Sequence, residues 1–331
     1  MSAPITEEAL STILRQYPLS EARALGPMEA SKRNDNFLVE DAMGQRYVLR
    51  RYRRNPDERR IAFQLRFQQE LRRRGFPTAD VLETAAGDLL LIEAGNSWAL
   101  FTYVEGDEFD FTRMGQVAEA GRRLAQFHTV TDSIELEEVT IPHNPTARRW
   151  WTHGEEELAA LEAMFRGEGV EDELTFLCEW RASLVREWPL VRLDILPSGW
   201  IHSDFHGRNV VFVGDELRGL FDFDPLHRGF WVEDVAHALF MFGRESRGSR
   251  RIRPQAARLF LHEYHRARPL LDDERAALPM MAVLVWSPSA PYHELLRRDG
   301  EDTLAFFRHY VELMRDIGAE MARLGSVLIG G

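Results

Sequence analysis

Carboxylate and amide side chains stand where two short apolar stretches of the sequence end. The stretch WIHSD ends in Asp204, and the loop FHGRN after it ends in Asn209. The next stretch, VVFVGDELRGLFDFD, has the pattern of a β-hairpin and ends with Asp222 and Asp224. Because a hairpin returns the chain to the end from which it started, we expect Asp204, Asn209 and Asp222 to converge on one pocket.

These side-chain types suit phosphoryl transfer to an alcohol. In such a reaction one carboxylate orients and deprotonates the hydroxyl, while an Asn and an Asp hold magnesium between nucleotide phosphates. Alternation along a strand puts Asp222 and Asp224 on the same face, so Asp224 is a candidate for a second metal or for the substrate. A single Asp in such a place is usually a turn former. A buried His202 beside two strands that end in carboxylates is costly, however, unless a partner or a cation uses the group.

Closely spaced His and Asp side chains also suit a metal-dependent hydrolase. Its site would consist of His202, Asp204, His206 and Asp222. The sequence has no further cluster of His or acidic residues that completes such a site convincingly, so we favour phosphoryl transfer.

The composition is that of an ordinary globular chain. It has 331 residues, 44% of them hydrophobic, which is enough for one large or two moderate cores. A formal net charge of −12 argues against broad contact with nucleic acid or anionic lipid. The single cysteine, the polar N-terminal stretch and the lack of a long apolar run lead us to expect a cytoplasmic protein that does not enter membranes.

The periodicity of the sequence changes after about the first hundred residues. Alternating apolar and polar residues predict one hairpin over 36–41 and 46–52 and another over 79–95 and 97–106, with a helix over 57–75 between them. Helical spacing then dominates, and it predicts amphipathic helices over 114–128, 172–188, 255–267 and 302–324. The most suitable boundary between the two regions lies near residues 104–109.

The motif His202-Ser-Asp204-x-His206-x-x-Asn209, followed by Phe-Asp222-Phe, resembles the catalytic loop and metal-binding segment of the aminoglycoside phosphotransferase and choline kinase-like family. The resemblance covers nearly the whole chain. It implies that Asp204 is the catalytic base, that Asn209 and Asp222 hold Mg²⁺, and that His202 orients the loop. Further along, Asp234 matches the helical Asp that braces this loop in such folds.

The same resemblance implies an α+β, two-lobe, protein-kinase-like fold. Residues 1–104 would form the nucleotide-binding lobe, with a small antiparallel sheet and one long helix. Residues 105–331 would form a larger, mainly helical lobe with the catalytic loop, the metal site and the acceptor pocket. Adenine would be received by backbone groups of the connecting stretch, around Thr102, Tyr103 and Val104.

The N-terminal half also departs from the family pattern. Arg50 stands where the family has a phosphate-binding Lys, and Gln64 stands where relatives usually carry Glu. One interpretation is that Arg50 holds the phosphates through its planar fork, with Gln64 as a neutral hydrogen-bond partner. Alternatively Lys32, the only lysine of the chain, reaches the phosphates from the loop that also contains Asn34. We prefer Arg50, because it occupies the matching strand position.

We therefore predict a kinase that transfers the γ-phosphate of ATP or GTP, with Mg²⁺, to a hydroxyl of a small molecule. Candidate acceptors are an aminoglycoside, an amino alcohol such as homoserine or choline, and a sugar. His206, Asp224 and Glu294 are candidates for contact with the acceptor. The alternative is a catalytically inactive pseudokinase that binds a nucleotide as a sensor or scaffold, which the missing strand Lys and helix Glu favour.

Overall fold

The computed structural model describes residues 5–28, 34–53, 57–139 and 147–329. Contacts divide the chain into two compact units. Unit 1 contains Met1–Asp107, Ile134–Val139 and Arg218–Asp224, and unit 2 contains Glu108–Ser133, Thr140–Leu217 and Pro225–Gly331. Whereas the sequence suggested one boundary near residue 104, the segment that carries Asp222 clusters with unit 1.

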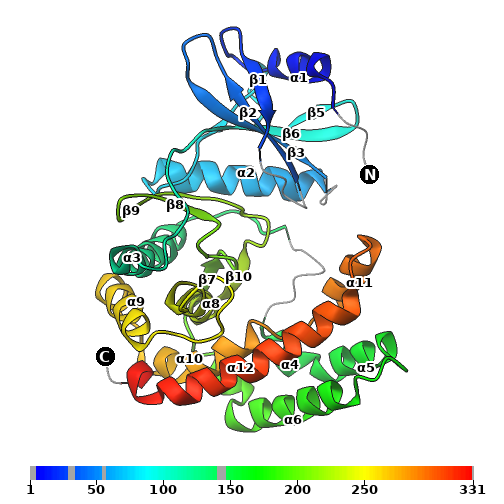
Figure 1. The fold of residues 1–331 in the computed structure, drawn as a ribbon, viewed down its shortest axis with the longest axis vertical. Coiled ribbons are helices and arrows are strands. Elements are labelled where there is room, and N and C mark those ends of the chain that lie inside the picture. The colour runs from blue at the N-terminus through cyan, green and yellow to red at the C-terminus, as the bar shows by residue number, and fades with distance from the viewer. Residues whose placement is uncertain (1–4, 29–33, 54–56, 140–146, 330–331) are drawn as a thin grey trace. The chain divides into compact units, whose positions relative to one another are not determined.

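Unit 1 contains an antiparallel sheet and two helices (Figure 1). The strand order is β1-β2-β3-β6-β4, and β5 also pairs with β6. The strands are β1 (Arg23–Pro27), β2 (Asn34–Glu40), β3 (Arg46–Tyr52), β4 (Val81–Leu82), β5 (Leu91–Glu93) and β6 (Asn96–Thr102), and the helices are α1 (Glu7–Leu14) and α2 (Glu58–Arg73). The two predicted hairpins and the long helix are confirmed.

The two faces of this sheet carry separate apolar clusters. Tyr47 and Leu49 of β3 pack in the cluster that includes α1, whereas Val48 and Tyr52 pack in the cluster that includes residues of α2. Successive side chains of a strand point to opposite faces. Arg50 therefore lies on the α2 face of the sheet, opposite Asn36 of β2 in the strand register.

The segment Arg218–Asp224 is fixed to unit 1 by backbone and side-chain bonds. After α2 the chain turns at Gly75, whose φ of 81° suits a residue without Cβ. The N–H of Leu220 then donates to the carbonyl of Pro77 at 3.0 Å, and the hydroxyl of Thr78 donates to the carbonyl of Leu220 at 2.7 Å. The residues just after Leu220 are thereby held beside α2.

Unit 2 is mainly helical. Its helices are α3 (Met114–Thr131), α4 (Arg149–Thr152), α5 (Gly154–Met164), α6 (Glu171–Glu187), α7 (Leu190–Leu193), α8 (Trp231–Gly243), α9 (Pro254–Ala267), α10 (Asp272–Leu284), α11 (Ala290–Arg298) and α12 (Thr303–Ile329). The strands β7 (Ser198–Ile201) and β10 (His227–Phe230) form one antiparallel pair. Strand β8 (Val210–Val213) pairs with β9 (Glu216–Leu220), whose residues from Arg218 onward belong to unit 1. The four predicted amphipathic helices correspond to α3, α6, α9 and α12.

Helix α8 is buried on nearly every side and forms the centre of unit 2. It packs against α3, α9, α10 and strand β7 (Figure 1). A helix that is apolar almost all round can be accommodated only inside such a core. The polar residues that α8 does carry are therefore placed rigidly, which matters for the site below.

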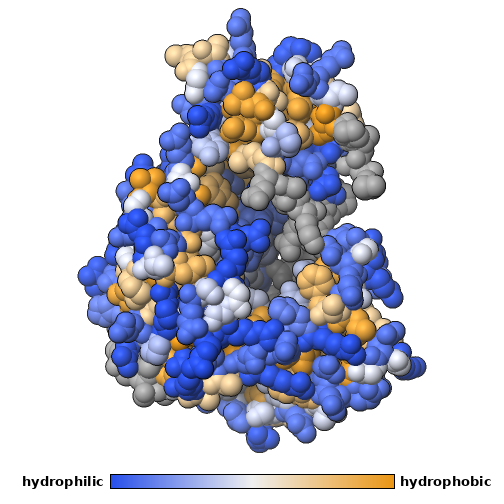
Figure 2. Space-filling model, viewed as in Figure 1, coloured by the Kyte–Doolittle hydropathy of each residue, from blue (hydrophilic) through white to orange (hydrophobic). Residues whose placement is uncertain are grey.

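The face of the molecule seen in Figure 2 is mainly hydrophilic. Large hydrophobic side chains that are exposed within the described ranges lie far apart in the sequence: Leu25, Met43, Ile92, Val185, Ile195, Val213 and Leu271. Single exposed hydrophobic residues are normal for a globular protein. Within those ranges, no helix has the length and apolar character needed to cross a membrane.

Gly121 tests the packing of α3 on α9. A Cβ atom at this position would overlap the backbone carbonyl of Phe260 in α9. We expect Gly121→Ala to lower the free energy of unfolding by about 1–3 kcal/mol, because the two backbones must separate. Urea denaturation of the full chain measures this change.

Gly318→Ala in α12 is the matched control. The nearest atom to its added Cβ lies at 3.8 Å, which is ordinary contact. The alanine should raise the free energy of unfolding by about 0.5–1 kcal/mol, because a helical glycine is entropically costly. Equal effects of the two substitutions would contradict the close approach of α3 and α9.

Candidate active site

Asp204 lies in the loop after β7, and two neighbours hold its carboxylate. The side-chain amide of Asn209 donates to Asp204 Oδ2 at 2.9 Å and to the Asp204 carbonyl at 3.0 Å. His206 Nε2 lies 3.2 Å from Asp204 Oδ1. The His206 proton is on Nε2, because Nδ1 accepts the N–H of Arg208 at 3.1 Å. The amide oxygen of Asn209 is then the atom that this side chain can offer to a metal.

The carboxylate of Asp234, in the first turn of α8, stabilises this loop through hydrogen bonds to its backbone. Its two oxygens accept the backbone N–H groups of His202 and Ser203, each at 2.7 Å. Ser203 has a φ of 65°, a left-handed conformation that is unfavourable for a residue with Cβ. These two bonds stabilise the turn that presents Asp204. The imidazole of His202, fully buried, also accepts the N–H of Asp204 at 3.3 Å.

A buried chain of hydrogen bonds stabilises the charge of Asp234. His128 Nε2 of α3 lies 3.2 Å from Asp234 Oδ2, and His128 Nδ1 lies 2.7 Å from the hydroxyl of Tyr264 in α9. Burial lowers the pKa of His128, so the ring is neutral at pH 7 and donates from Nε2 to the carboxylate. Burial alone would raise the pKa of Asp234, but the hydrogen bond from His128, the nearby ring of His202 and the N–H of His202 together lower it.

Asp204 is ionised for a similar reason. Burial disfavours its charged form, but the hydrogen bond from His206 and the nearby rings of His237 and His202 hold the pKa of Asp204 below its usual range. At neutral pH this carboxylate is a hydrogen-bond acceptor of low basicity. Such a group orients a hydroxyl well and takes its proton only late in a reaction.

Asp222 lies in the segment of unit 1 that follows β9. The strand ends at Leu220, and Asp222 has a φ of 61°. The expectation that Asp222 and Asp224 share one strand face is therefore wrong, because the left-handed residue interrupts the alternation. Asp222 Oδ1 is buried and has no hydrogen-bond partner among the described residues. An unpaired buried carboxylate oxygen is costly unless a cation binds it, so Asp222 fits the role of a metal ligand.

Two side chains of α2 hold the backbone of this segment. The carbonyl of Asp224 accepts from Gln64 Nε2 at 3.1 Å and from Arg60 NH2 at 3.0 Å. Arg60 is buried and also donates to the carbonyl of Val139 at 2.7 Å. The carboxylate of Asp224 is 3.4 Å from the side-chain nitrogen of Asn34. Helix α2 thus positions the turn that carries Asp222.

Arg50 lies on the α2 face of the sheet. Its Nε donates to the side-chain oxygen of Asn36 at 3.1 Å, and its guanidinium lies 5.6 Å from the ring centroid of Phe101. Burial opposes its charge, yet Tyr52, Asp222 and Asp224 raise the pKa of Arg50. Among the described residues, Arg50 bonds Asn36 and Gln64 bonds the Asp224 carbonyl, so the suggested pairing of Arg50 with Gln64 stays a prediction. Lys32 lies outside the described residues.

In the connecting stretch, two of the backbone N–H groups already have partners. The N–H of Thr102 donates to the carbonyl of Asp80 at 3.0 Å, and the N–H of Tyr103 donates to the carbonyl of Arg46 at 3.1 Å. Within the described part of the chain, Val104 has no backbone hydrogen bond. Its side chain is partly buried in the apolar cluster on the α2 face, together with Val48 and Phe221.

Comparison with known proteins places the chain in a family. Residues 26–270 match the model of the phosphotransferase enzyme family. The chain belongs to this family. Homoserine kinase of Rhizobium etli is 30% identical over 278 residues, which cover 84% of this chain and 82% of that protein. The resemblance stated from the sequence motifs is confirmed.

Solved structures support the fold. A microcompartment-associated aminopropanol kinase has a TM-score of 0.68 at 17% identity and covers 97% of this chain and 98% of its own. An amicoumacin kinase in complex with AMP-PNP, Ca²⁺ and Ami has a TM-score of 0.67 at 15% identity and covers 95% of this chain and 94% of its own. The predicted α+β, kinase-like fold is confirmed.

Glu294, a predicted acceptor contact of this phosphotransferase, is engaged within its own helix. Glu294 forms ion pairs with Arg297 and Arg298 of its own helix α11, so these arginines occupy its carboxylate.

His237, which sequence analysis did not single out, lies beside His206, with 6.4 Å between ring centroids. Its spacing of three residues from Asp234 on a helix was the available signal, since such residues share a face.

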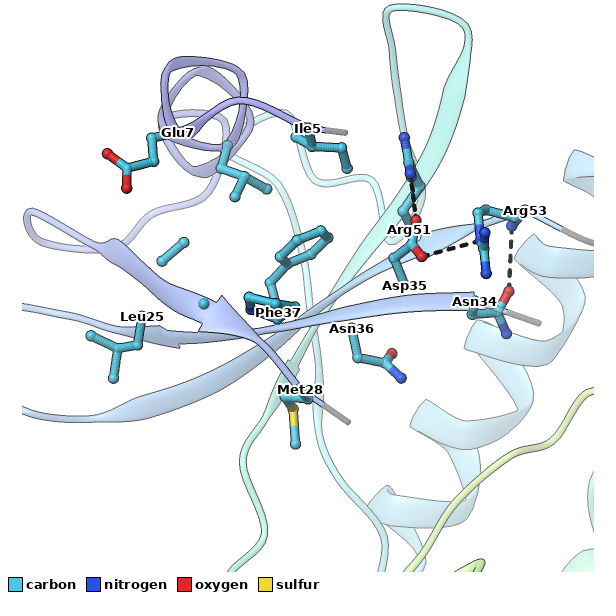
Figure 3. A pocket seen from close by; sticks show the side chains of 14 residues that line it. Ile5, Glu7, Leu25, Met28, Asn34, Asp35, Asn36, Phe37, Arg51 and Arg53 are labelled. Carbon is cyan, nitrogen blue, oxygen red and sulfur yellow. Dashed lines mark hydrogen bonds and ion pairs between the residues drawn. The ribbon is translucent and has the colours of Figure 1, made fainter. Parts of the chain in front are cut away.

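A groove of about 450 Å³ in unit 1 is lined in part by Asn34 and Asn36, which contact Asp224 and Arg50 (Figure 3). Its lining includes Ile5, Leu25 and Phe37, and at one end Asp35 accepts from Arg51 at 2.8 Å and pairs with Arg53 at 3.1 Å. Arg50, Gln64 and Asp222 do not line it. The ion pairs satisfy its charged end internally, and the groove meets the candidate site residues through Asn34 and Asn36.

Asp234→Asn tests the brace under the catalytic loop. An amide has one accepting oxygen in place of two, so one buried N–H of residues 202–203 loses its partner. We expect kcat of this phosphotransferase to fall about tenfold or more, with the KM for nucleotide changed less than threefold. Steady-state kinetics at saturating acceptor measure both.

Glu233→Gln is the matched control on the same turn of α8. Burial raises the pKa of Glu233 to about 7, and its Oε1 accepts the N–H of Phe230 at 2.7 Å. Glutamine keeps this accepting oxygen without charge, so kcat should change less than twofold. Equal losses in both variants would show that Asp234 acts only through general stability of the helix.

Proposed function

We propose that the chain is an ATP-dependent kinase of a small hydroxylated amine, with L-homoserine as the first acceptor to test. The observation that carries the proposal is the ionised carboxylate of Asp204, held between Asn209 and His206 on a braced loop. Family membership supports phosphotransfer, and the homoserine kinases among the relatives support the acceptor class. The proposed place of action is the cytoplasm, where ATP is available.

The proposed role of Asp204 follows from its charge and its low basicity. Its carboxylate would accept a hydrogen bond from the acceptor hydroxyl and align the oxygen with the γ-phosphate. The proton would pass to Asp204 as the new O–P bond forms and the bond to the ADP oxygen breaks. Because the transition state is loose, a weak base at this position is sufficient.

Residues of unit 1 would hold the nucleotide. The proposed adenine partners are the free backbone groups of Val104, with Val48 and Phe221 as apolar contacts. Arg50 would bind the phosphates, because it is always charged and can present a planar pair of N–H groups. Its neighbours Asp222 and Asp224 keep this cation among carboxylates that a metal would partly neutralise.

A divalent cation fits the donor set of the chain. The unpaired Oδ1 of Asp222 and the amide oxygen of Asn209 are the oxygen ligands that Mg²⁺ prefers. The ATP-analogue complex of the amicoumacin kinase contains Ca²⁺. We propose Mg²⁺ as the cation of this chain, where it would neutralise charge on the phosphates.

Asp204→Asn tests catalysis directly. We expect release of ADP in the presence of L-homoserine to fall about 100-fold or more, because the hydroxyl loses its base. Affinity for ATP and Mg²⁺, measured by calorimetry, should change less than threefold. The acceptor panel should also contain 3-aminopropan-1-ol, choline and an aminoglycoside.

The outcomes separate the candidate functions. Wild-type protein that binds ATP but phosphorylates nothing in the panel would favour the pseudokinase. Loss of folding in Asp204→Asn would make Asp204 structural. Tight binding of zinc or manganese without nucleotide would favour the hydrolase.

Arg50→Ala tests the phosphate contact. We expect it to weaken ATP binding tenfold or more, whereas Lys32→Ala should weaken it less than threefold. Arg51→Ala is the control on the same strand, because Arg51 bonds Asp35 on the opposite face of the sheet. Arg50→Lys should retain part of the affinity, since it keeps the charge and loses the fork. The reverse ranking of Arg50 and Lys32 would reject Arg50 as the clamp.

A further inference from the structure

His237 of α8 lies beside His206, whose ring contacts the carboxylate of Asp204. It follows Asp234 by three residues on the helix and is 7% exposed. Its ring centroid is 6.4 Å from that of His206, whose Nε2 lies 3.2 Å from Asp204 Oδ1. The same helix face therefore braces the catalytic loop through Asp234 and borders the catalytic carboxylate through His237.

The indole of Trp286, just beyond α10, packs next to the ring of His237. Its ring centroid is 5.2 Å from that of His237 at an interplanar angle of 34°, and 5.5 Å from that of Phe240 at 75°. The backbone N–H of Trp286 donates to the carbonyl of Val283 at 3.2 Å, which ties the residue to the end of the helix. Two aromatic contacts and this bond fix the position of the indole.

Both rings have a buried nitrogen without a partner. Within the described residues, neither His237 Nδ1 nor Trp286 Nε1 has a hydrogen-bond partner. By contrast, both ring nitrogens of the buried His128 have partners, Tyr264 at Nδ1 and Asp234 at Nε2. Two unsatisfied nitrogens on neighbouring rings are costly in a folded protein. A ligand that supplies the missing bonds would remove that cost.

The chemistry of the two rings limits what the ligand can be. An indole N–H donates and never accepts, so its partner must have a lone pair. An ammonium group has none and cannot fill this position. Burial lowers the pKa of His237 to about 4, so at neutral pH its ring is uncharged, with one N–H and one lone pair. An oxygen, such as one of a carboxylate, can accept from both rings.

We propose that His237 and Trp286 form an acceptor subsite that binds an oxygen of the substrate remote from the reacting hydroxyl, which in a hydroxy amino acid is the carboxylate. The inference rests on the proposed function and goes further by naming what the acceptor must carry besides its hydroxyl and amine. The subsite would make the enzyme prefer hydroxy amino acids over amino alcohols of the same length.

Two matched acceptors test the subsite. L-Homoserine and 3-aminopropan-1-ol share the chain, the hydroxyl and the amine, and differ by the carboxylate. We expect wild-type protein to favour L-homoserine in kcat/KM. Trp286→Phe keeps an aromatic ring and removes the N–H, so the KM for L-homoserine should rise about tenfold or more. The KM for 3-aminopropan-1-ol should change less than threefold.

A second variant and a control keep the test decisive if one protein folds poorly. His237→Phe removes both ring nitrogens and should give the same selective loss. Trp98→Phe removes another buried indole N–H without a described partner, from the α1 face of the sheet in unit 1. It should leave both KM values within twofold. Binding of AMP-PNP and the melting temperature report whether each variant is folded.

The results separate this inference from the proposed function. Equal losses for the two acceptors, no loss for either, or a wild-type preference for 3-aminopropan-1-ol would overturn the subsite and leave the kinase intact. Phosphorylation of neither acceptor by wild-type protein would overturn the proposed acceptor, and the subsite with it. Calorimetry of L-homoserine with AMP-PNP-loaded Asp204→Asn should reproduce the selective loss as weaker binding.

Discussion

The loop that carries Asp204 depends on one buried carboxylate. Asp234 accepts the N–H groups of His202 and Ser203, and this pair of bonds stabilises the left-handed turn at Ser203. The charge of Asp234 is stabilised in turn by His128. Helices α3, α8 and α9 thus determine the orientation of the loop through this buried chain of hydrogen bonds. The central burial of α8 is what makes this support rigid.

In unit 1, hydrogen bonds from helix side chains likewise hold the backbone beside a left-handed residue. Asp222, like Ser203, has a left-handed conformation, and side chains from a helix hold the backbone beside it. Here the supporting groups are Arg60 and Gln64 of α2, which share the carbonyl of Asp224. In both units a functional carboxylate or loop is therefore positioned by hydrogen bonds to the main chain. Substitutions in the supporting residues would act on catalysis without contact to substrate.

Elements with clear periodicity were predictable from the sequence, and so was the constellation of polar loop residues. The hairpin over β2 and β3 and the long amphipathic helices follow from local patterns. The left-handed turn at Asp222 was not predictable, because its cause is a set of bonds from α2, more than 150 residues away in the chain. His237 was missed for the same reason: its significance comes from Trp286 and His206, which only tertiary packing brings close.

Arg50 has a consequence for how this protein can be detected. A nucleotide analogue that carries a reactive acyl group can label a protein only where an amine lies beside its phosphates. A guanidinium whose pKa is raised by neighbouring carboxylates stays protonated and is not a nucleophile. The chain has a single lysine, Lys32, outside the matching strand position. Surveys that count nucleotide-binding enzymes by lysine labelling would therefore overlook chains built this way, even where nucleotide is bound.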